Sequence, residues 1–272
     1  MSTIVLTDRQ FREREYFDEW VSRQQILEVN FDLVDALETR PWNPYWYLAE
    51  VVKGMYTSPS QRLLDFGCGF GYYALNFRKV GYEVFGFDIS ASNIATARNL
   101  AQRYNLVERT HFDVGTAETV HYPSDQFDVI VGVDILHHVD IEPSIRECHR
   151  LLKPGGVAVF KEPIAVPIFD TLRNTSAGEA LCSRQKSFER CVTDDERKLT
   201  TDDVKTIASI FPDLTIQRFR LCSRLDAFWR HLRSPTHAAV QRKLERFDQT
   251  CLQLLPFLRR FGGEVVMTMR KS

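Results

Sequence analysis

A glycine-rich turn lies between two aspartates and is the first place in the chain where residue spacing suggests chemistry. A short apolar run ends at Asp65 and is followed by Gly67, Gly69 and Gly71, and Asp88 ends a second apolar run seventeen residues beyond Gly71. Glycines in such a turn adopt backbone angles that other residues avoid and let a ligand approach the main chain. A carboxylate at the end of the second strand can accept hydrogen bonds from ribose hydroxyls. The spacing therefore predicts a nucleoside-binding site.

The charges around this turn favour one nucleoside over another. A dinucleotide site has the pattern G-x-G-x-x-G and places a pyrophosphate at a helix N-terminus. This chain has G-x-G-x-G, and Asp65, which precedes the turn, would repel a pyrophosphate. The same carboxylate suits a positively charged amino group or a sulfonium, and S-adenosylmethionine carries both and has no phosphate. The sequence therefore predicts S-adenosylmethionine as cofactor, with S-adenosylhomocysteine as its product, and disfavours NAD.

The elements that position this site follow from the hydropathy pattern. From residue 61, short apolar runs typical of buried parallel strands alternate with helical stretches. We expect strands at 62–66, 83–88, 110–114, 127–133, 156–161, 214–221 and 264–270. We expect helices at 45–55, 72–79, 91–104, 142–152, 201–210 and 236–259, and helical spacing also runs from residue 8 to about 40. Because crossovers between parallel strands are right-handed, the fold class is α/β with a Rossmann-like, doubly wound sheet.

Four motifs occur in order within residues 61–161: LLDFGCGFG, VFGFDIS, QFDVIVGVDILHHV and LLKPGG. As a set they resemble the motifs of class I S-adenosylmethionine-dependent methyltransferases, and most closely those of the group that acts on small molecules. The resemblance implies a seven-stranded sheet that is mostly parallel, with its last strand antiparallel. It also implies an enzyme that moves a methyl group by in-line displacement to a small-molecule acceptor, which is a natural-product intermediate, a sugar or a lipid-like compound.

The resemblance also implies contacts with the cofactor, carried over by position. They are Asp65, Gly67, Cys68 and Gly69 at the methionine end, Asp88 at the ribose, Ile89 at the adenine, Val133 and Asp134 near the sulfonium, and Tyr16 from the N-terminal part. The family has an acidic residue within a G-D-A-E type sequence after the third strand, where this chain reads Gly115-Thr116-Ala117-Glu118. Thr116 departs from that pattern, so either its hydroxyl or the Ala117 main chain takes the adenine contact.

Candidate catalytic groups follow the fourth and fifth strands. Methyl transfer mainly requires alignment of the acceptor with the methyl group, and a hydroxyl acceptor also benefits from a general base. Ligands bind outside the carboxyl ends of the strands in open α/β sheets, which makes His137, His138 and Glu162 the candidate bases. The alternative for the histidines is that one packs or caps while the other faces solvent, and we expect Asp134 to shape the pocket. Nothing resembles the acidic cluster of metal-dependent O-methyltransferases, so we predict no metal.

Length and patterning indicate one domain with four parts. We expect an N-terminal helical cap or lid (1–57), a nucleotide-binding core (58–162), a cap or substrate-lid insertion (163–200) and a C-terminal part that completes the sheet (201–272). Aromatic residues crowd the N-terminal part, where they either close over an apolar substrate or hold its helices against the sheet.

Composition excludes several classes of protein. With 272 residues, 44% of them hydrophobic, the chain can bury a large core, and a net charge of -1 gives no global footprint for nucleic acid or an anionic membrane. No apolar run approaches the roughly 20 residues that span a bilayer. The N-terminus lacks the apolar stretch of a secretory signal, and the six cysteines form no CxxC pair. We therefore expect a cytoplasmic protein with a small-molecule substrate, no nucleic acid partner and no membrane span.

Two other functions stay open. A nucleic-acid or protein methyltransferase is the alternative enzyme, although the fourth strand ends in VDILHH rather than a Pro-Pro-aromatic sequence and no basic tail is present. From another class, the chain could bind S-adenosylmethionine without catalysis. The sequence assigns neither the methylated atom nor the oligomeric state.

Overall fold

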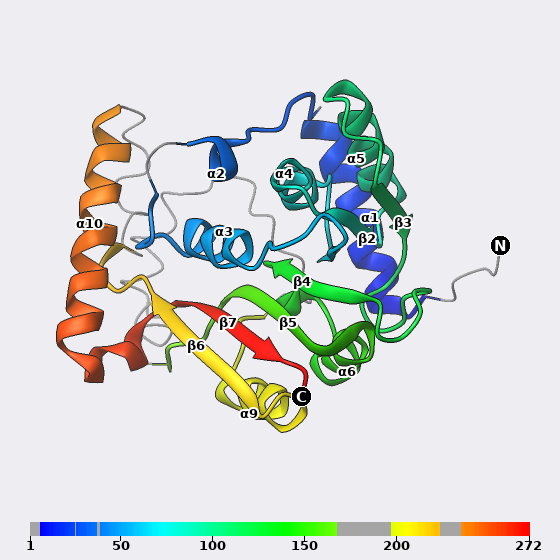
Figure 1. The fold of residues 1–272 in the computed structure, drawn as a ribbon. Coiled ribbons are helices and arrows are strands. Elements are labelled where there is room, and N and C mark those ends of the chain that lie inside the picture. Colours follow the sequence, from blue (N-terminus) through cyan, green and yellow to red (C-terminus); the bar gives the residue numbers. More distant parts are fainter. Residues whose placement is uncertain (1–5, 25, 37–38, 168–196, 224–234) are drawn as a thin grey trace.

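The chain builds one seven-stranded sheet with the strand order β3-β2-β1-β4-β5-β7-β6 (Figure 1). A computed structural model describes residues 6–24, 26–36, 39–167, 197–223 and 235–272. Of the seven strands, β7 is the one that runs antiparallel to its neighbours. The strands are β1 (Arg62–Phe66), β2 (Glu83–Asp88), β3 (Thr110–Val114), β4 (Phe127–Val133), β5 (Leu152–Pro163), β6 (Asp213–Phe219) and β7 (Glu264–Arg270). The predicted α/β class and antiparallel last strand are confirmed.

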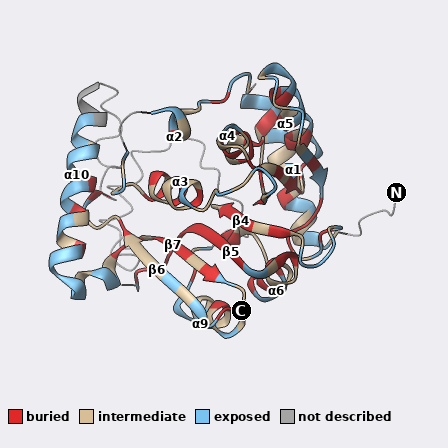
Figure 2. Ribbon diagram, viewed as in Figure 1, coloured by how far each residue is buried: buried red, intermediate tan, exposed pale blue. Residues whose placement is uncertain are grey.

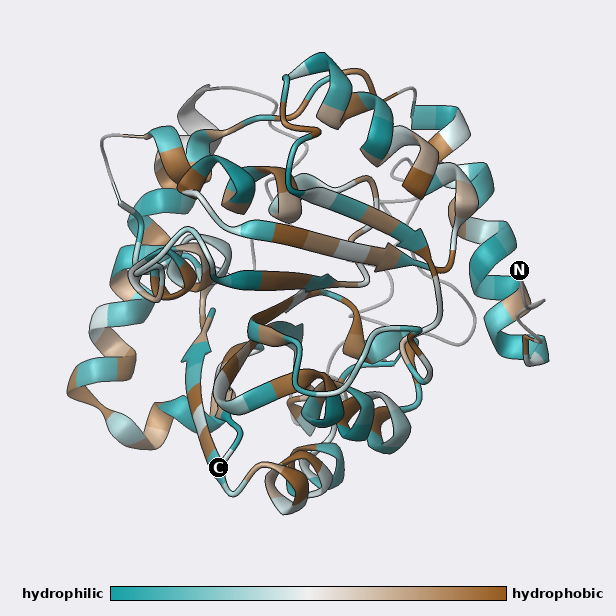
Figure 3. Ribbon diagram, turned by 45° about the vertical axis from the view of Figure 1, so that its right-hand side comes forward, coloured by the Kyte–Doolittle hydropathy of each residue, from teal (hydrophilic) through white to brown (hydrophobic). Residues whose placement is uncertain are grey.

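Helices cover both faces of the sheet, because successive residues of a strand point to opposite sides. Leu63 of β1 joins the buried cluster beneath α3, α4 and α5, whereas Leu64 joins the cluster beneath α6 and α9. Figure 3 shows hydrophobic residues concentrated along the strands. The helices are α1 (Asp8–Gln24), α2 (Asp32–Asp35), α3 (Pro44–Gly54), α4 (Tyr72–Val80), α5 (Ala91–Arg103), η1 (Leu136–His138), α6 (Ile141–Leu151), α9 (Thr201–Ile210), α10 (Pro235–Leu254) and η3 (Pro256–Phe261).

Two stretches with helical spacing are less helical than their sequences predict. The first helix ends at Gln24 rather than near residue 40, and the chain then turns toward the sheet. There the side chain of Asn30 accepts the backbone N–H of Asp32 at 2.6 Å, a local bond that competes with helix formation. At the other end of the chain, α10 stops at Leu254 because Pro256 lacks the N–H that would continue it.

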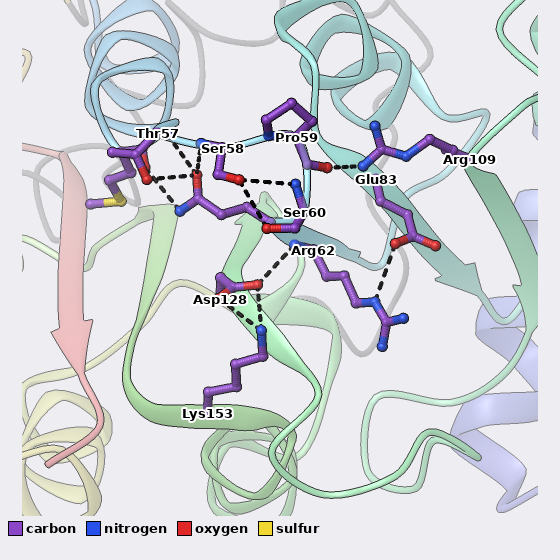
Figure 4. Close-up of polar contacts among 11 residues, drawn as sticks. Thr57, Ser58, Pro59, Ser60, Arg62, Glu83, Arg109, Asp128 and Lys153 are labelled. Atoms are coloured by element: carbon purple, nitrogen blue, oxygen red, sulfur yellow. Dashed lines mark hydrogen bonds and ion pairs between the residues drawn. The ribbon is translucent and has the colours of Figure 1, made fainter.

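Polar contacts hold the amino-terminal ends of the central strands in register (Figure 4). Asp128 of β4 accepts the backbone N–H of Arg62 at 2.8 Å and the Lys153 ammonium of β5 at 2.8 Å. The guanidinium of Arg62 also reaches Glu83 of β2 at 3.2 Å. Polar contacts of residues from β1, β2, β4 and β5 therefore stabilise the amino-terminal ends of these strands.

No helix in the described part of the chain combines the length and the apolar character that crossing a bilayer requires. The cytoplasmic location stays a prediction. Cys68, Cys148, Cys222 and Cys251 are free thiols, whereas Cys182 and Cys191 lie outside the described residues. Most of the predicted insertion at 163–200 lies outside them as well, and the four-part division stays a prediction.

Candidate active site

The glycine turn forms the floor of the site. Gly67, Gly69 and Gly71 have φ angles of 74°, 51° and 83°, a region that other residues rarely adopt. They carry the chain from the end of β1 into α4. The backbone N–H of Gly69 donates to Oδ2 of Asp88 at 2.9 Å, so the turn is tied to the end of β2. The predicted strand, turn, helix and acidic residue are therefore all present in one unit.

A cavity of about 650 Å³ opens above this turn. Its size lies within the usual range for small-molecule and cofactor sites. It is bounded by the carboxyl ends of β1, β2, β4 and β5, the turn after β3, and parts of α1 and α3. Among the predicted site residues, the following line it: Asp65, Gly67, Cys68, Gly69, Asp88, Ile89, Thr116, Ala117, Val133, Asp134, His137 and His138. The structure thus gathers all of the predicted site residues except Tyr16 and Glu162 around one pocket.

Asp65 places a buried carboxylate at the base of the pocket. It is 2% exposed, and its Oδ2 accepts the backbone N–H of Ala74 at 2.9 Å. Burial raises the pKa of Asp65 to about 7; the Ala74 N–H opposes this rise, and the charge of Asp88 adds to it. The groups that set this pKa include no cation, so the site is electrostatically suited to a positively charged ligand group.

Asp88 shapes the loop as well as facing the pocket. Besides the Gly69 N–H, it accepts the backbone N–H of Ser90 at 2.9 Å and the side-chain amide of Asn93 at 3.1 Å. Burial nevertheless raises its pKa, because these bonds only partly offset desolvation. A carboxylate offers about four acceptor positions. Three are in use here, so one remains for a hydroxyl of a ligand.

One face of α1 covers the pocket. Gln10, Glu13, Phe17 and Trp20 line it, at the three- and four-residue spacing that places side chains on the same side of a helix. Tyr16, which we predicted near the cofactor, is not among the lining residues, and its ring packs edge-on against Phe17 with centroids 5.3 Å apart. Tyr16 lies at the border of this face, about 40° beyond Trp20 on the side away from Phe17, and its ring packs on Phe17 instead of entering the pocket.

An acidic residue reaches the region where Thr116 departs from the family pattern. The Thr116 hydroxyl is directed to its own turn, donating to the Thr119 carbonyl at 3.4 Å. Glu118 lines the pocket two residues later, where its carboxylate accepts the amide of Gln10 at 2.7 Å and the backbone N–H of Asp140 at 3.3 Å. The sequence contained this residue within its G-T-A-E stretch, but the prediction did not use it.

Glu162 lies behind His137 rather than in the pocket. It is 0% exposed, and its Oε1 accepts the backbone N–H groups of Ile135 and Leu136 at 2.9 and 2.8 Å. Its Oε2 lies 2.7 Å from Nδ1 of His137, a residue that lines the pocket. Glu162 is therefore misplaced to act directly on an acceptor, which corrects its prediction as a base. It is well placed to orient the imidazole, since a carboxylate on Nδ1 makes Nε2 the acceptor nitrogen.

His138 has a similar partner from a different element. Its Nδ1 lies 3.3 Å from Oε2 of Glu13 on α1, and Glu13 is 4% exposed. The rings of His137 and His138 are adjacent, with centroids 4.2 Å apart. Both histidines therefore face one pocket beside a buried carboxylate, but the His137 pair is hydrogen-bonded whereas the His138 pair has only an ion-pair distance. The sequence could not reveal the second pair, because 125 residues separate its members.

A buried polar network that the sequence did not reveal closes the far side of the pocket. Lys161 is 2% exposed, and its ammonium lies 2.8 Å from Asp134, 3.0 Å from the Tyr45 hydroxyl and 3.2 Å from Glu264. The Tyr45 hydroxyl donates to Asp134 at 2.9 Å. Burial raises the pKa of Tyr45 to about 12, with the charge of Lys161 opposing the rise. Tyr45 therefore acts as a neutral donor, and the two donors hold the Asp134 carboxylate toward the pocket.

Three of these groups come close enough to be considered as metal ligands. Donor atoms of Asp134, His137 and Glu162 lie within 4.8 Å of one another. However, Glu162 already bonds two backbone N–H groups and His137, and Asp134 already bonds Lys161 and Tyr45. A cation here would have to displace the Lys161 ammonium or the hydrogen bonds of Glu162. Absence of a metal stays our prediction.

Comparison with known proteins finds methyltransferases that are similar to part of the chain. Residues 64–160 match the family model described as a methyltransferase domain. This stretch is similar to class I S-adenosylmethionine-dependent methyltransferases. This chain is 35% identical over 99 residues to the ubiquinone biosynthesis O-methyltransferase of Bradyrhizobium sp. (strain ORS 278), a match that covers 36% of this chain and 38% of that one. It is 34% identical over 130 residues to the uncharacterized methyltransferase YcgJ of Bacillus subtilis, covering 47% and 51%. The chain thus spans about half or less of the length of these relatives.

A solved structure shares the fold over nearly the whole chain. The geranyl diphosphate C-methyltransferase of Streptomyces coelicolor, in complex with Mg²⁺, geranyl diphosphate and S-adenosyl-L-homocysteine, superposes with a TM-score of 0.58. The identity is 14%, and the match covers 98% of each chain. At this identity the likeness concerns the fold.

The pocket fits S-adenosylmethionine, the cofactor of the similar proteins. No heavy atom lies within 4 Å of the point where a Cβ of Gly69 would stand, so the turn leaves open space directly above the main chain. Asp65 offers a buried anion and Asp88 a remaining acceptor position beside that space. These groups match the cationic amino acid end and the ribose of S-adenosylmethionine, respectively.

Proposed function

We propose that the chain transfers the methyl group of S-adenosylmethionine to a hydroxyl of a small-molecule acceptor, with His137 as the general base. The observation that carries this proposal is that the cofactor turn and a carboxylate-paired histidine line the same cavity. When bound, the cofactor supplies an activated methyl group on a positively charged sulfur. The remaining requirement on the protein is to hold the acceptor in line and to take up its proton.

The base is needed because a neutral hydroxyl is a weak nucleophile. An imidazole that is held by a carboxylate through Nδ1 presents Nε2 as a proton acceptor, and such a base contributes about 10²- to 10⁴-fold to the rate. The Glu162 contact is short and its carboxylate is fixed by two backbone N–H groups. His137 is therefore oriented by a rigid group, which favours it over His138. The O-methyltransferase relative agrees with a hydroxyl acceptor.

The acceptor end of the pocket is aromatic with a polar corner. Phe17, Trp20 and Tyr73 line it together with the corner formed by Tyr45 and Asp134. Flat aromatic walls suit a ring-bearing or lipid-like acceptor. The Asp134 carboxylate, held by its two donors, can accept a hydrogen bond from that acceptor and so orient it. Asp134 acts in this proposal as a positioning residue.

The test measures S-adenosylhomocysteine formation with a panel of phenols, sugars and lipid-like alcohols. With an acceptor that is turned over, Glu162→Gln keeps an acceptor oxygen for the Ile135 and Leu136 N–H groups but reverses the polarity at Nδ1 of His137. We expect kcat to fall about 10²- to 10⁴-fold, with little change in the dissociation constant of the cofactor.

Glu13→Gln is the control, because it neutralises the buried carboxylate that lies beside His138. A loss of less than tenfold in this variant supports His137 as the base, whereas the opposite ranking would transfer that role to His138. Binding of S-adenosylmethionine without turnover of any acceptor would instead support a non-catalytic binding protein. Methylation of RNA or protein would support the alternative enzyme.

Two further expectations belong to this proposal. Turnover that is unchanged by EDTA would agree with a reaction that needs no metal. A loss of turnover in EDTA that added Mg²⁺ reverses would instead assign a metal to the group of Asp134, His137 and Glu162.

For the cofactor, Asp88→Ala should abolish the thermal stabilisation by S-adenosylmethionine, which is about 2.7 kcal/mol at a hundred times its dissociation constant.

A further inference from the structure

An exposed apolar stripe lies on α10 and η3, two helices that contribute no residue to the lining of the pocket. Five of the nine exposed large apolar side chains in the described chain belong to this segment: Val240, Phe247, Leu254, Leu255 and Phe257. Leu254 is 74% exposed and Phe257 60%. Single exposed apolar residues are common, but a cluster of this kind indicates an interaction surface.

The charged residues around the stripe are all basic. Within residues 239–260 the exposed charged side chains are Arg242, Lys243, Arg246, Arg259 and Arg260. The two acidic residues of that range are turned inward. Glu245 is 4% exposed and accepts the Asn43 side-chain amide, and Asp248 is 2% exposed and accepts the backbone N–H groups of Leu221, Cys222 and Ser223. We call the exposed apolar and basic side chains of residues 239–260 the basic apolar face.

The geometry of the helix makes this face continuous. Val240, Phe247 and Leu254 are spaced seven residues apart, which shifts each by only about 20° around the helix from the one before. Lys243 lies about 60° from Val240, beside the stripe. Figure 1 shows α10 at the edge of the molecule next to β6, and Figure 2 shows exposed residues along its outer side. Apolar and basic side chains can therefore contact one extended surface together.

We propose that this face binds the surface of a bilayer that contains anionic lipids. A helix with Phe and Leu on one side and Lys or Arg beside them lies in the plane of the lipid headgroups, with its apolar side chains in the acyl boundary. Charge complementarity selects this occupant. A second copy of the chain would, in a two-fold dimer, place the same five cations against each other. Nucleic acid would match the cations but would leave the five apolar side chains unused.

The test is cosedimentation of the full chain with vesicles. We expect binding to an equal mixture of phosphatidylcholine and phosphatidylglycerol, weak binding to phosphatidylcholine alone, and a loss of binding as NaCl is raised, because salt screens the surface potential. Each basic residue near an anionic surface contributes about fivefold to the partition coefficient. Arg242→Gln with Lys243→Gln should therefore weaken binding about 25-fold, and Phe247→Ser with Leu254→Ser should weaken it on neutral and anionic vesicles alike.

The matched controls lie elsewhere on the surface. Arg103→Gln and Val107→Ser remove a basic and an apolar side chain that are about half exposed and belong to the other edge of the sheet, and binding should be unchanged. Thermal unfolding shows whether each variant is folded. Equal partitioning of wild type and the α10 variants, or no partitioning at all, would overturn the proposal. If the chain does not bind vesicles but forms a dimer that Phe247→Ser dissociates, the proposal is overturned, and the face instead binds a second copy of the chain. Because no methyl transfer is measured, the result is independent of the proposed activity.

Discussion

Asp65→Asn should make the protein more stable and less able to bind its cofactor. The carboxylate of Asp65 is 2% exposed, and burial raises its pKa from 3.8 to about 7, with the nearby charge of Asp88 adding to the rise. The native state without ligand therefore holds an anion that would be better solvated in the unfolded chain. Asparagine keeps the shape and the acceptor oxygen for Ala74 N–H but removes the charge. The carboxylate that serves cofactor binding therefore lowers the free energy of unfolding of the ligand-free protein.

The size and the sign of the effect follow from the pKa. A rise from 3.8 to about 7 corresponds to a penalty of at most about 4 kcal/mol. Between these pH values the native state binds more protons than the unfolded state, so stability falls as pH rises through the window. The penalty is fully present above pH 7 and absent below pH 4. Asp65→Asn should thus raise the melting temperature by up to about 10 °C at pH 8 and leave it unchanged at pH 4.

Two assays on the same samples check this reasoning. Thermal unfolding without ligand gives the stability difference across pH, and isothermal titration with S-adenosylmethionine gives the affinity. Loss of a charged hydrogen-bond partner should weaken binding about 10- to 150-fold. Asp113→Asn, at an exposed carboxylate of β3, should change neither the thermal stability nor the affinity for S-adenosylmethionine. A variant that is no more stable than wild type at pH 8, or that binds the cofactor normally, would refute the role assigned to Asp65.

Two further predictions concern the turn and the buried lysine. Gly69→Ala and Gly155→Ala both place a Cβ at a positive φ with no atom within 4 Å, so each should cost about 1 kcal/mol of stability. Only Gly69→Ala should abolish thermal stabilisation by S-adenosylmethionine, and equal ligand shifts in the two variants would contradict the placement of the cofactor. Lys161→Met removes the cation that Asp134 and Glu264 share, although Tyr45 still donates to Asp134 and Arg220 still pairs with Glu264. The free energy of unfolding should therefore fall by about 1–3 kcal/mol in urea denaturation. A stability equal to wild type would show that the network contributes little.

Local patterns in the sequence predicted most of the fold. The ranges expected for β1, β2, β3, β4 and β7 agree with the structure. These strands are runs of apolar residues bounded by turns, and the family resemblance supplied the antiparallel last strand, whereas the strand order came from the structure. The cofactor turn was equally visible, because a strand, three glycines, a helix and Asp88 lie within 27 residues. Predictions based on periodicity alone were less accurate, as the early end of α1 shows.

The amino-acid sequence by itself thus determined the class of fold and the cofactor turn, because both depend on residues that are close together along the chain. Tertiary structure decided which side chains share the pocket. The face of α1 that carries Glu13 and Phe17 rather than Tyr16 toward the pocket depends on how the helix docks. The contact between Tyr45 and Lys161 joins residues 116 apart, and its strength depends on burial that no local pattern encodes. Only packing brings such groups out of water, and removal from water is what gives their charges and hydrogen bonds their effect.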